Sequence, residues 1–137
     1  MASLALAIQD AIADALIGIE TTDDAGATIV VPVHGDVPDD AAFPYVEIGQ
    51  QSKVPIDDYD ETLDLHVIYL SVWSRYRGKA QVLTVLAAME QRLHDRQLLL
   101  ASGSCVSCRV SNQVANREPD NVTYQGAMTV QVIAVAG

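Results

Sequence analysis

The run TLDLHVIYLSVWS, from Thr62 to Ser74, constrains the fold more than any other part of the chain. Its side chains alternate between two faces in the manner of a β-strand. Apolar residues occupy both faces after His66, which predicts a central strand covered on two sides, either by helices of the same chain or by a neighbouring subunit. We expect Trp73 to pack in the core. One face carries Leu63, Leu65, Val67, Tyr69 and Trp73, and the other His66, Ile68, Leu70 and Val72.

Two segments show the spacing of amphipathic helices. Residues 3–19 form the first, with Ser3 as the N-cap, and residues 79–96 form the second. Their predicted buried stripes are Leu4, Ile8, Ala11, Ile12, Ala15, Leu16 and Ile19 in the first helix and Val82, Leu83, Leu86, Met89 and Leu93 in the second.

The remaining strands are shorter. They are expected at 28–33, 45–49, 105–114 and 122–132, with loops at 34–44 and after Gly49. Pro32 cannot donate a ladder hydrogen bond, so the first of these strands belongs at a sheet edge. The order α-β-β-β-α-β-β predicts an α+β fold: a small mixed or antiparallel sheet of four to five strands with two helices packed on it. With 137 residues, the chain fits a single domain spanning 1–137.

The charge balance limits the kinds of partner that this chain can bind. The net charge of -10 argues against general affinity for DNA or for anionic membranes, which are bound chiefly through Lys and Arg. The apolar N-terminus has no basic start and contains Gln9, Asp10 and Asp14, so it does not read as a secretory signal. No stretch reaches the length of a membrane span. We therefore expect assembly in a cytosol-like compartment and no membrane partner.

Cys105 and Cys108 form a C-x-x-C pair within a strand-like segment. Residues three apart on a strand point to opposite faces, and no second cysteine or histidine pair completes a zinc site. A redox pair would normally open a helix. We interpret both as strand residues, with Cys108 facing inward together with Val106 and Val110.

The sequence predicts no catalytic, cofactor-binding or metal site. The acidic loop 57–64 contains Asp57, Asp58, Asp60 and Glu61, but it lacks the central glycine and final glutamate of an EF-hand, which favours a solvated loop. His66 reads as a satisfied, half-buried histidine rather than a catalytic base.

Three groups of residues together resemble a known family. They are VHGDVPDDAAFPYVEIGQ (33–50), LSVWSRYRGKAQVLTVLAAMEQRL (70–93) and the Y-x-G of VTYQGAMTVQV. In this order and spacing the chain resembles the tail-completion or tail-terminator proteins of long-tailed phages, prophages and gene transfer agents. The matching positions are structural: Pro44, Tyr45, Gly49, Trp73, Ser74 and Gly78.

The resemblance implies a non-enzymatic ring, usually of six subunits, on the head-proximal end of the tail tube. Such a ring ends tube polymerisation and offers a surface for joining the head. The implied partners are the chain itself, the tail tube protein and a head–tail connector or neck protein, with DNA only as transiting cargo. The implied location is the tail of a virion or phage-like particle assembled in the bacterial host cytoplasm.

The basic turn at Arg75, Arg77 and Lys79 stands out in so acidic a chain. Cations at a helix N-terminus cost about 0.3 to 1 kcal/mol each, so either they simply face solvent or something negative meets them. The candidates are DNA phosphate and a carboxylate-rich protein surface on an adjoining subunit or tail protein. The loop holding Asp57, Asp58, Asp60 and Glu61 in a neighbouring subunit is one such surface, because a closed ring repeats one heterologous contact.

Two other functions remain open at this point. A head–tail connector or neck ring protein would have similar size and architecture. A small cytosolic enzyme or ligand-binding domain would use the cysteine pair or the acidic loop.

Overall fold

The computed structural model describes residues 3–23, 25–57, 62–76 and 78–136. Of the predicted interface residues, Asp58, Asp60, Glu61 and Arg77 lie outside these ranges. The helices are α1 (Leu4–Ala15) and α2 (Ala80–Leu93). The strands are β1 (Glu20–Thr22), β2 (Thr28–Val30), β3 (Val33–His34), β4 (Tyr45–Asp57), β5 (Thr62–Ser74), β6 (Ser104–Arg117) and β7 (Tyr124–Val135).

The main sheet has the strand order β3-β4-β5-β7-β6. β3 pairs in parallel with β4, and the other neighbours are antiparallel, so the sheet is mixed. β1 and β2 form a separate antiparallel pair. The predicted α+β fold is confirmed, with the strand expected at 28–33 divided into β2 and β3 and with the short β1 in addition. β5 is the central strand, as its apolar run predicts.

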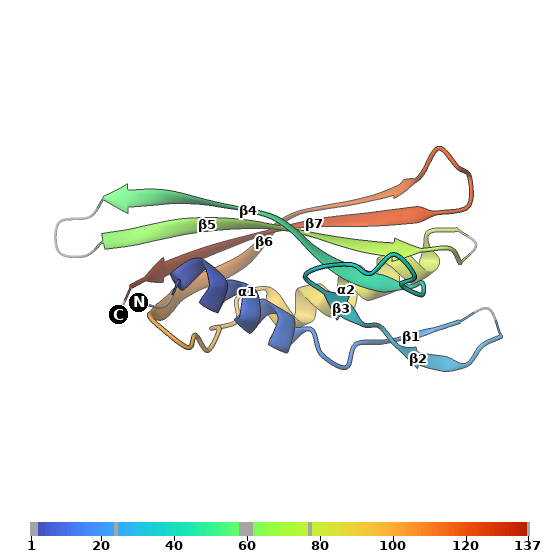
Figure 1. Cartoon of the computed structure of the whole chain (residues 1–137), viewed down its shortest axis with the longest axis horizontal. Helices are drawn as coiled ribbons and strands as arrows, with labels where there is room; N and C mark the ends of the chain where they lie inside the picture. The colour runs from blue at the N-terminus through green and yellow to red at the C-terminus, as the bar shows by residue number, and fades with distance from the viewer. Residues whose placement is uncertain (1–2, 24, 58–61, 77, 137) are drawn as a thin grey trace.

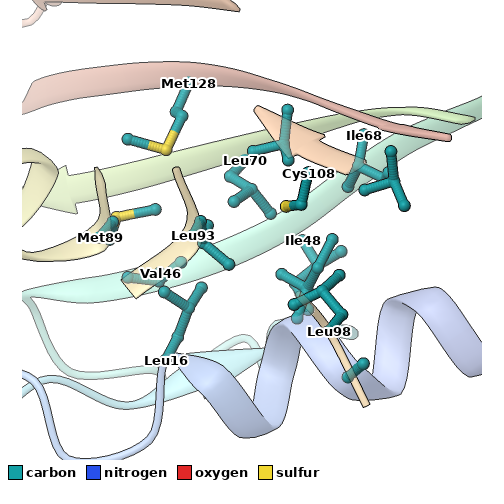
Figure 2. Packing of buried hydrophobic residues seen from close by; sticks show 14 of the residues in the cluster. Leu16, Val46, Ile48, Ile68, Leu70, Met89, Leu93, Leu98, Cys108 and Met128 are labelled. Atoms are coloured by element: carbon teal, nitrogen blue, oxygen red, sulfur yellow. The ribbon is translucent and has the colours of Figure 1, made fainter. Parts of the chain in front are cut away.

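Both helices and the β1–β2 pair lie on one side of the main sheet (Figure 1). The Ser3 hydroxyl caps α1 by accepting from the amide of Leu6, as expected. The core forms between this layer and the inward faces of the strands, and Figure 2 shows Leu16 of the α1 segment and Met89 of α2 directed toward Ile48, Ile68 and Met128.

β4 is longer than expected. The sequence predicts a strand only over 45–49 followed by a loop, but β4 continues to Asp57 and pairs with β5 along almost its whole length. A bulge between Ile48 and Gln51 interrupts the alternation. This bulge and the edge residue Pro55 make residues 50–57 look like a loop in the sequence.

Trp73 is not in the core. The residues of β5 that face the helices are Asp64, His66, Ile68, Leu70, Val72 and Ser74, all buried. Trp73 lies on the other face, with Leu63, Leu65, Val67 and Tyr69. Among the described residues no helix covers that face (Figure 1), which we call the open face of the sheet. The expected second cover is therefore not supplied by helices of the same chain.

Leu83 and the C-x-x-C pair also differ from expectation. Leu83 is exposed on α2, and Val85 takes the buried position. Both Cys105 and Cys108 are buried, while Val106 is exposed. A bulge between Cys105 and Ser107 shifts the alternation of β6, so the two thiols share the inward face instead of pointing to opposite sides.

Candidate interaction surface

The basic turn is held by the last residue of β5. The buried hydroxyl of Ser74 donates to Oε1 of Gln81 and accepts from the amide of Tyr76 at 3.1 Å. The amide nitrogen of Gln81 in turn donates to the Thr22 carbonyl at 2.7 Å, which ties α2 to β1. Gly78 has φ +74, a conformation that glycine adopts without strain. The described residues on either side of position 77 are thus held to the fold, and Arg75 and Lys79 are exposed.

Arg75 contacts residues of its own chain. Its guanidinium carbon lies 4.3 Å from the centre of the Phe43 ring, and its Nε donates to Oγ1 of Thr123 at 3.3 Å. Among the described residues Arg75 has no ion-pair partner within 4.0 Å. The side chain is therefore positioned by an aromatic ring and a hydroxyl while its positive charge stays exposed at the surface.

The loop between β6 and β7 places a carboxylate near Arg75. Asp120 accepts hydrogen bonds from the amides of Val122 and Thr123 and from the Thr123 hydroxyl, at 2.7 to 2.9 Å. The bonds from Thr123 contribute most, then that from Val122, and together they lower the pKa of Asp120 to about 2. Asp120 is thus ionised at neutral pH and fixed in direction.

A shallow hollow of about 390 Å³ opens beside these groups. Its lining includes Tyr45 and Trp73, which are paired across β4 and β5. Trp73 donates from its indole nitrogen to Glu47 at 3.1 Å. The lining also includes Phe43, Arg75, Glu118, Pro119, Asp120 and Thr123. The hollow combines aromatic faces with charges of both signs, a composition found at protein–protein contacts.

Of the predicted contact residues that the structure describes, Asp57 and Arg75 lie at opposite ends of β5. Asp57 ends β4 and pairs with Thr62, the first residue of β5, whereas Arg75 directly follows Ser74, the last residue of β5. Thirteen residues of strand span about 40 Å. Lys79 is exposed at the N-terminus of α2 and makes no capping bond with its side chain. The backbone of Asp57 is therefore a full strand length away from Arg75 within one subunit.

The other family-motif positions have structural roles. Pro44 is buried and follows a cis peptide bond, and Tyr45 begins β4. Gly49 lies at the β4 bulge, where a Cβ atom would come within 3.1 Å of the Tyr69 carbonyl oxygen. Gly126, the glycine of the Y-x-G motif, faces α2 so closely that a Cβ atom would lie 2.5 Å from Cγ1 of Val82.

His66 differs from the sequence interpretation. It is fully buried on the inward face of β5, and neither of its ring nitrogens has a hydrogen-bond partner among the described residues. It is paired with Lys53 of β4 and Val132 of β7, and Asp64 lies two residues away on the same face. Burial lowers the pKa of His66, an effect that nearby Asp64 opposes and Lys53 reinforces.

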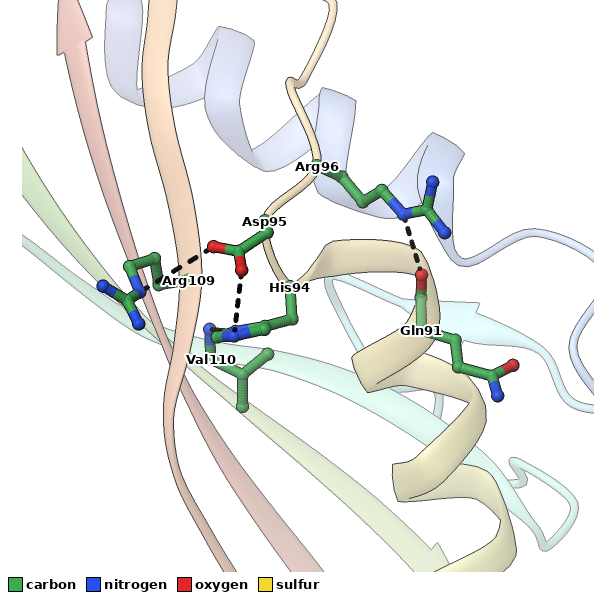
Figure 3. A network of polar contacts seen from close by, with 6 residues as sticks. All are labelled: Gln91, His94, Asp95, Arg96, Arg109 and Val110. Atoms are coloured by element: carbon green, nitrogen blue, oxygen red, sulfur yellow. Dashed lines mark hydrogen bonds and ion pairs between the residues drawn. The ribbon is translucent and has the colours of Figure 1, made fainter.

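A polar cluster joins the end of α2 to β6 (Figure 3). Nδ1 of His94 accepts from the amide of Val110 at 3.0 Å, so a neutral ring carries its proton on Nε2, which faces Asp95 at 3.5 Å. Arg109 lies 3.9 Å from the same carboxylate. The cluster fixes the helix against the edge strand, and we assign it no chemistry.

Neither the cysteines nor the acidic residues form a reactive site in the described part of the chain. Burial, followed by the proximity of Cys105 and Asp95, raises the pKa of Cys108 to about 12, and both thiols are free. Within residues 3–23, 25–57, 62–76 and 78–136, no three potential metal ligands come together. No described helix is long and apolar enough to cross a membrane.

Comparisons with known proteins agree with this architecture. A family model described as tail completion protein gp17 matches residues 14–134. The structure is similar to a chain from the virion of a native gene transfer agent particle, with a TM-score of 0.78 and 21% sequence identity over the full length of both chains. At that identity the likeness shows the shared fold. No curated protein matches the chain.

Proposed function

The chain belongs to the family of tail completion protein gp17, and we propose that it completes the tail of a phage-like particle as an oligomeric ring. This is a family of structural tail proteins, not an enzyme family. In the proposal, six subunits sit on the head-proximal end of the tail tube, end its polymerisation and present the surface that joins the head. DNA passes through the lumen as cargo.

The match to the family model over residues 14–134 is the observation that carries this proposal. It includes α2, all strands of the main sheet and every family-motif position. The net charge of -10 supports a lumen that repels DNA and lets it pass, because a wall rich in Lys and Arg would bind phosphate.

The charged groups at the two ends of β5 are the proposed contact residues. Arg75, Arg77 and Lys79 would meet a carboxylate-rich protein surface, on the neighbouring subunit or on an adjoining tail protein. Asp57, Asp58, Asp60 and Glu61 would offer such a surface to a basic partner. Arg75 supports this assignment because Phe43 and Thr123 hold it in place without neutralising it.

Purified particles test the proposal. An antibody or a tag on this chain, imaged by electron microscopy, should label one site per particle at the junction of head and tail. Host cells lacking the gene should accumulate heads without tails and tails of excess length. Normal particles with tails of normal length in those cells would contradict the proposed role.

A further inference from the structure

We propose that the open face of one subunit packs against the helical layer of the next subunit, and that this contact closes the ring. The helical layer consists of α1, α2 and the β1–β2 pair. The inference rests on the proposed function, because it names the surfaces by which that ring forms. The occupant of the open face is thus a second copy of this chain.

The open face mixes apolar and uncharged polar residues and carries little charge at its described positions. Val54, Val67, Tyr69, Val114 and Ile133 point outward there, and Tyr69 is 44% and Val54 52% exposed. On the described positions of this face in β4 to β7, the only charged residues are Glu47 and Arg109. Depletion of charge at the centre of a surface distinguishes protein interfaces from other surfaces. Arg109 is the only basic residue at these described positions, which favours a protein over DNA as the occupant.

The face is large enough for a specific contact. Four neighbouring strands of about 12 residues give an area of about 40 Å by 19 Å, or about 750 Å². A standard protein interface buries about 800 Å² on each partner. The exposed apolar side chains on this face, such as Val54, Tyr69 and Val114, are also an aggregation risk on a lone subunit, which a ring neighbour would remove.

The helical layer offers a second surface of the same kind. Ile17, Val30 and Leu83 belong to the layer on the other side of the sheet, and Val30 is 60% and Leu83 52% exposed. In the first two turns of α2 the exposed positions Ala80, Leu83, Thr84 and Ala87 are uncharged and mostly small, whereas the last turns expose Glu90 and Arg92. The solvent-facing side of α1, in contrast, includes Asp10 and Asp14. The surface around Leu83 is therefore the part of this layer that best matches the open face.

Two different surfaces on opposite sides of one subunit are what a closed ring requires. A ring repeats a heterologous contact, in which one patch of each subunit meets another patch of its neighbour.

Cysteine crosslinking in purified particles tests the contact. Variants Y69C, V54C and V114C are each combined with L83C and treated with a short bismaleimide; three sheet positions allow for a lateral shift of the subunits. Cys105 and Cys108 are buried and serve as an unreactive background, checked with the wild-type chain. At least one double variant should give a ladder from dimer to closed ring, and each single variant should give none.

The matched control is V122C paired with L83C, because Val122 is 55% exposed but lies in the loop between β6 and β7. No ladder from any double variant, in particles that contain the variant chain, overturns the inference and leaves the tail function standing. A dimer from Y69C alone also overturns it, because it means sheet-to-sheet contact. If purified particles do not contain the chain but the concentrated pure protein gives the ladder, the contact stands and the proposed function is rejected.

Discussion

Ser74, the last residue of β5, donates its buried hydroxyl to the side-chain carbonyl of Gln81 in the first turn of α2. The same hydroxyl accepts from the amide of Tyr76, so one oxygen joins the strand, the basic turn and the helix.

Replacing Ser74 by alanine should destabilise the fold. The S74A variant leaves Oε1 of Gln81 buried without this donor, at a cost of about 1–3 kcal/mol. Urea unfolding measures the loss. The matched control is T84A, because the Thr84 hydroxyl donates to the Ala80 carbonyl on an exposed part of α2 and should change stability by less than about 0.5 kcal/mol. Equal losses in both variants would contradict the assigned role.

Gly126 should tolerate no larger residue. A Cβ atom there would lie 2.5 Å from Cγ1 of Val82 and 2.9 Å from Cδ1 of Leu86, on the helix that covers the sheet. G126A should therefore cost about 1–3 kcal/mol through overpacking, and G126V more. The neighbouring substitution A127V adds volume on the open face and should leave the unfolding free energy of the isolated chain nearly unchanged. A G126A variant of wild-type stability would show that α2 can shift away at no cost.

His66 should make the fold sensitive to mild acid. Burial lowers its pKa in the native state below the ordinary 6.5, so at falling pH the unfolded chain takes up a proton before the native chain does. The stability that depends on neutral His66 is fully present above pH 6.5. It decreases as the pH falls from 6.5 toward the pKa of His66 in the native state. Unfolding free energies measured by urea between about pH 7.5 and pH 5 should show the decrease.

The H66L variant isolates that contribution. It removes an imidazole whose nitrogens have no described partner, so its stability at neutral pH should equal or exceed that of the wild type. All other titratable groups are common to the two proteins, so the difference between the two pH profiles belongs to His66. If the two profiles run parallel through this range, His66 does not titrate as proposed.

The sequence predicted the positions of helices and strands better than it predicted which face of each is buried. The apolar run of β5 correctly indicated a central strand, and the spacing of Ile8, Ile12 and Leu16 correctly indicated the buried side of α1. Alternation alone cannot show which face of a strand the helices cover when both faces are apolar. For that reason Trp73 was wrongly expected in the core.

Irregular strands explain most of the remaining differences. The bulge after Cys105 brings both thiols to one face, and the bulge after Ile48 hides the second half of β4, because each extra residue inverts the alternation beyond it. The contact of Arg75 with Phe43 and Thr123 joins residues 32 and 48 positions away in the sequence. No local pattern encodes such a contact, so only the position of the basic turn could be predicted.

The two thiols should be inert in the native protein. Burial raises the pKa of Cys108 to about 12, so almost none of it is thiolate at neutral pH, and Cys105 is also buried. Titration with an aromatic disulfide reagent should detect no fast-reacting thiol in buffer and two per chain in denaturant. Rapid reaction of either thiol in the folded chain would revive the alternative of a redox or ligand-binding role for this pair.

Substitutions of Lys79 should change the stability of the isolated chain and its assembly in opposite directions. Lys79 is exposed at the N-terminus of α2, where the helix dipole disfavours a cation, and its side chain makes no capping bond. The K79D variant places an acceptor and a negative charge there, so the isolated chain should become more stable by about 0.3 to 1 kcal/mol. If the basic turn meets an acidic partner, the same variant should assemble poorly, giving longer tails and fewer joined heads.

The K79N variant separates charge from capping. Asparagine also caps helices well, so K79N should share the gain in thermal stability, but it removes one positive charge without adding a negative one. Assembly should then decrease in the order wild type, K79N, K79D, while the melting temperature of the isolated chain rises in both variants. Full assembly by K79D would mean that Lys79 faces only solvent. In that case the helix dipole would favour aspartate at position 79, and nothing in the structure explains why lysine stands there.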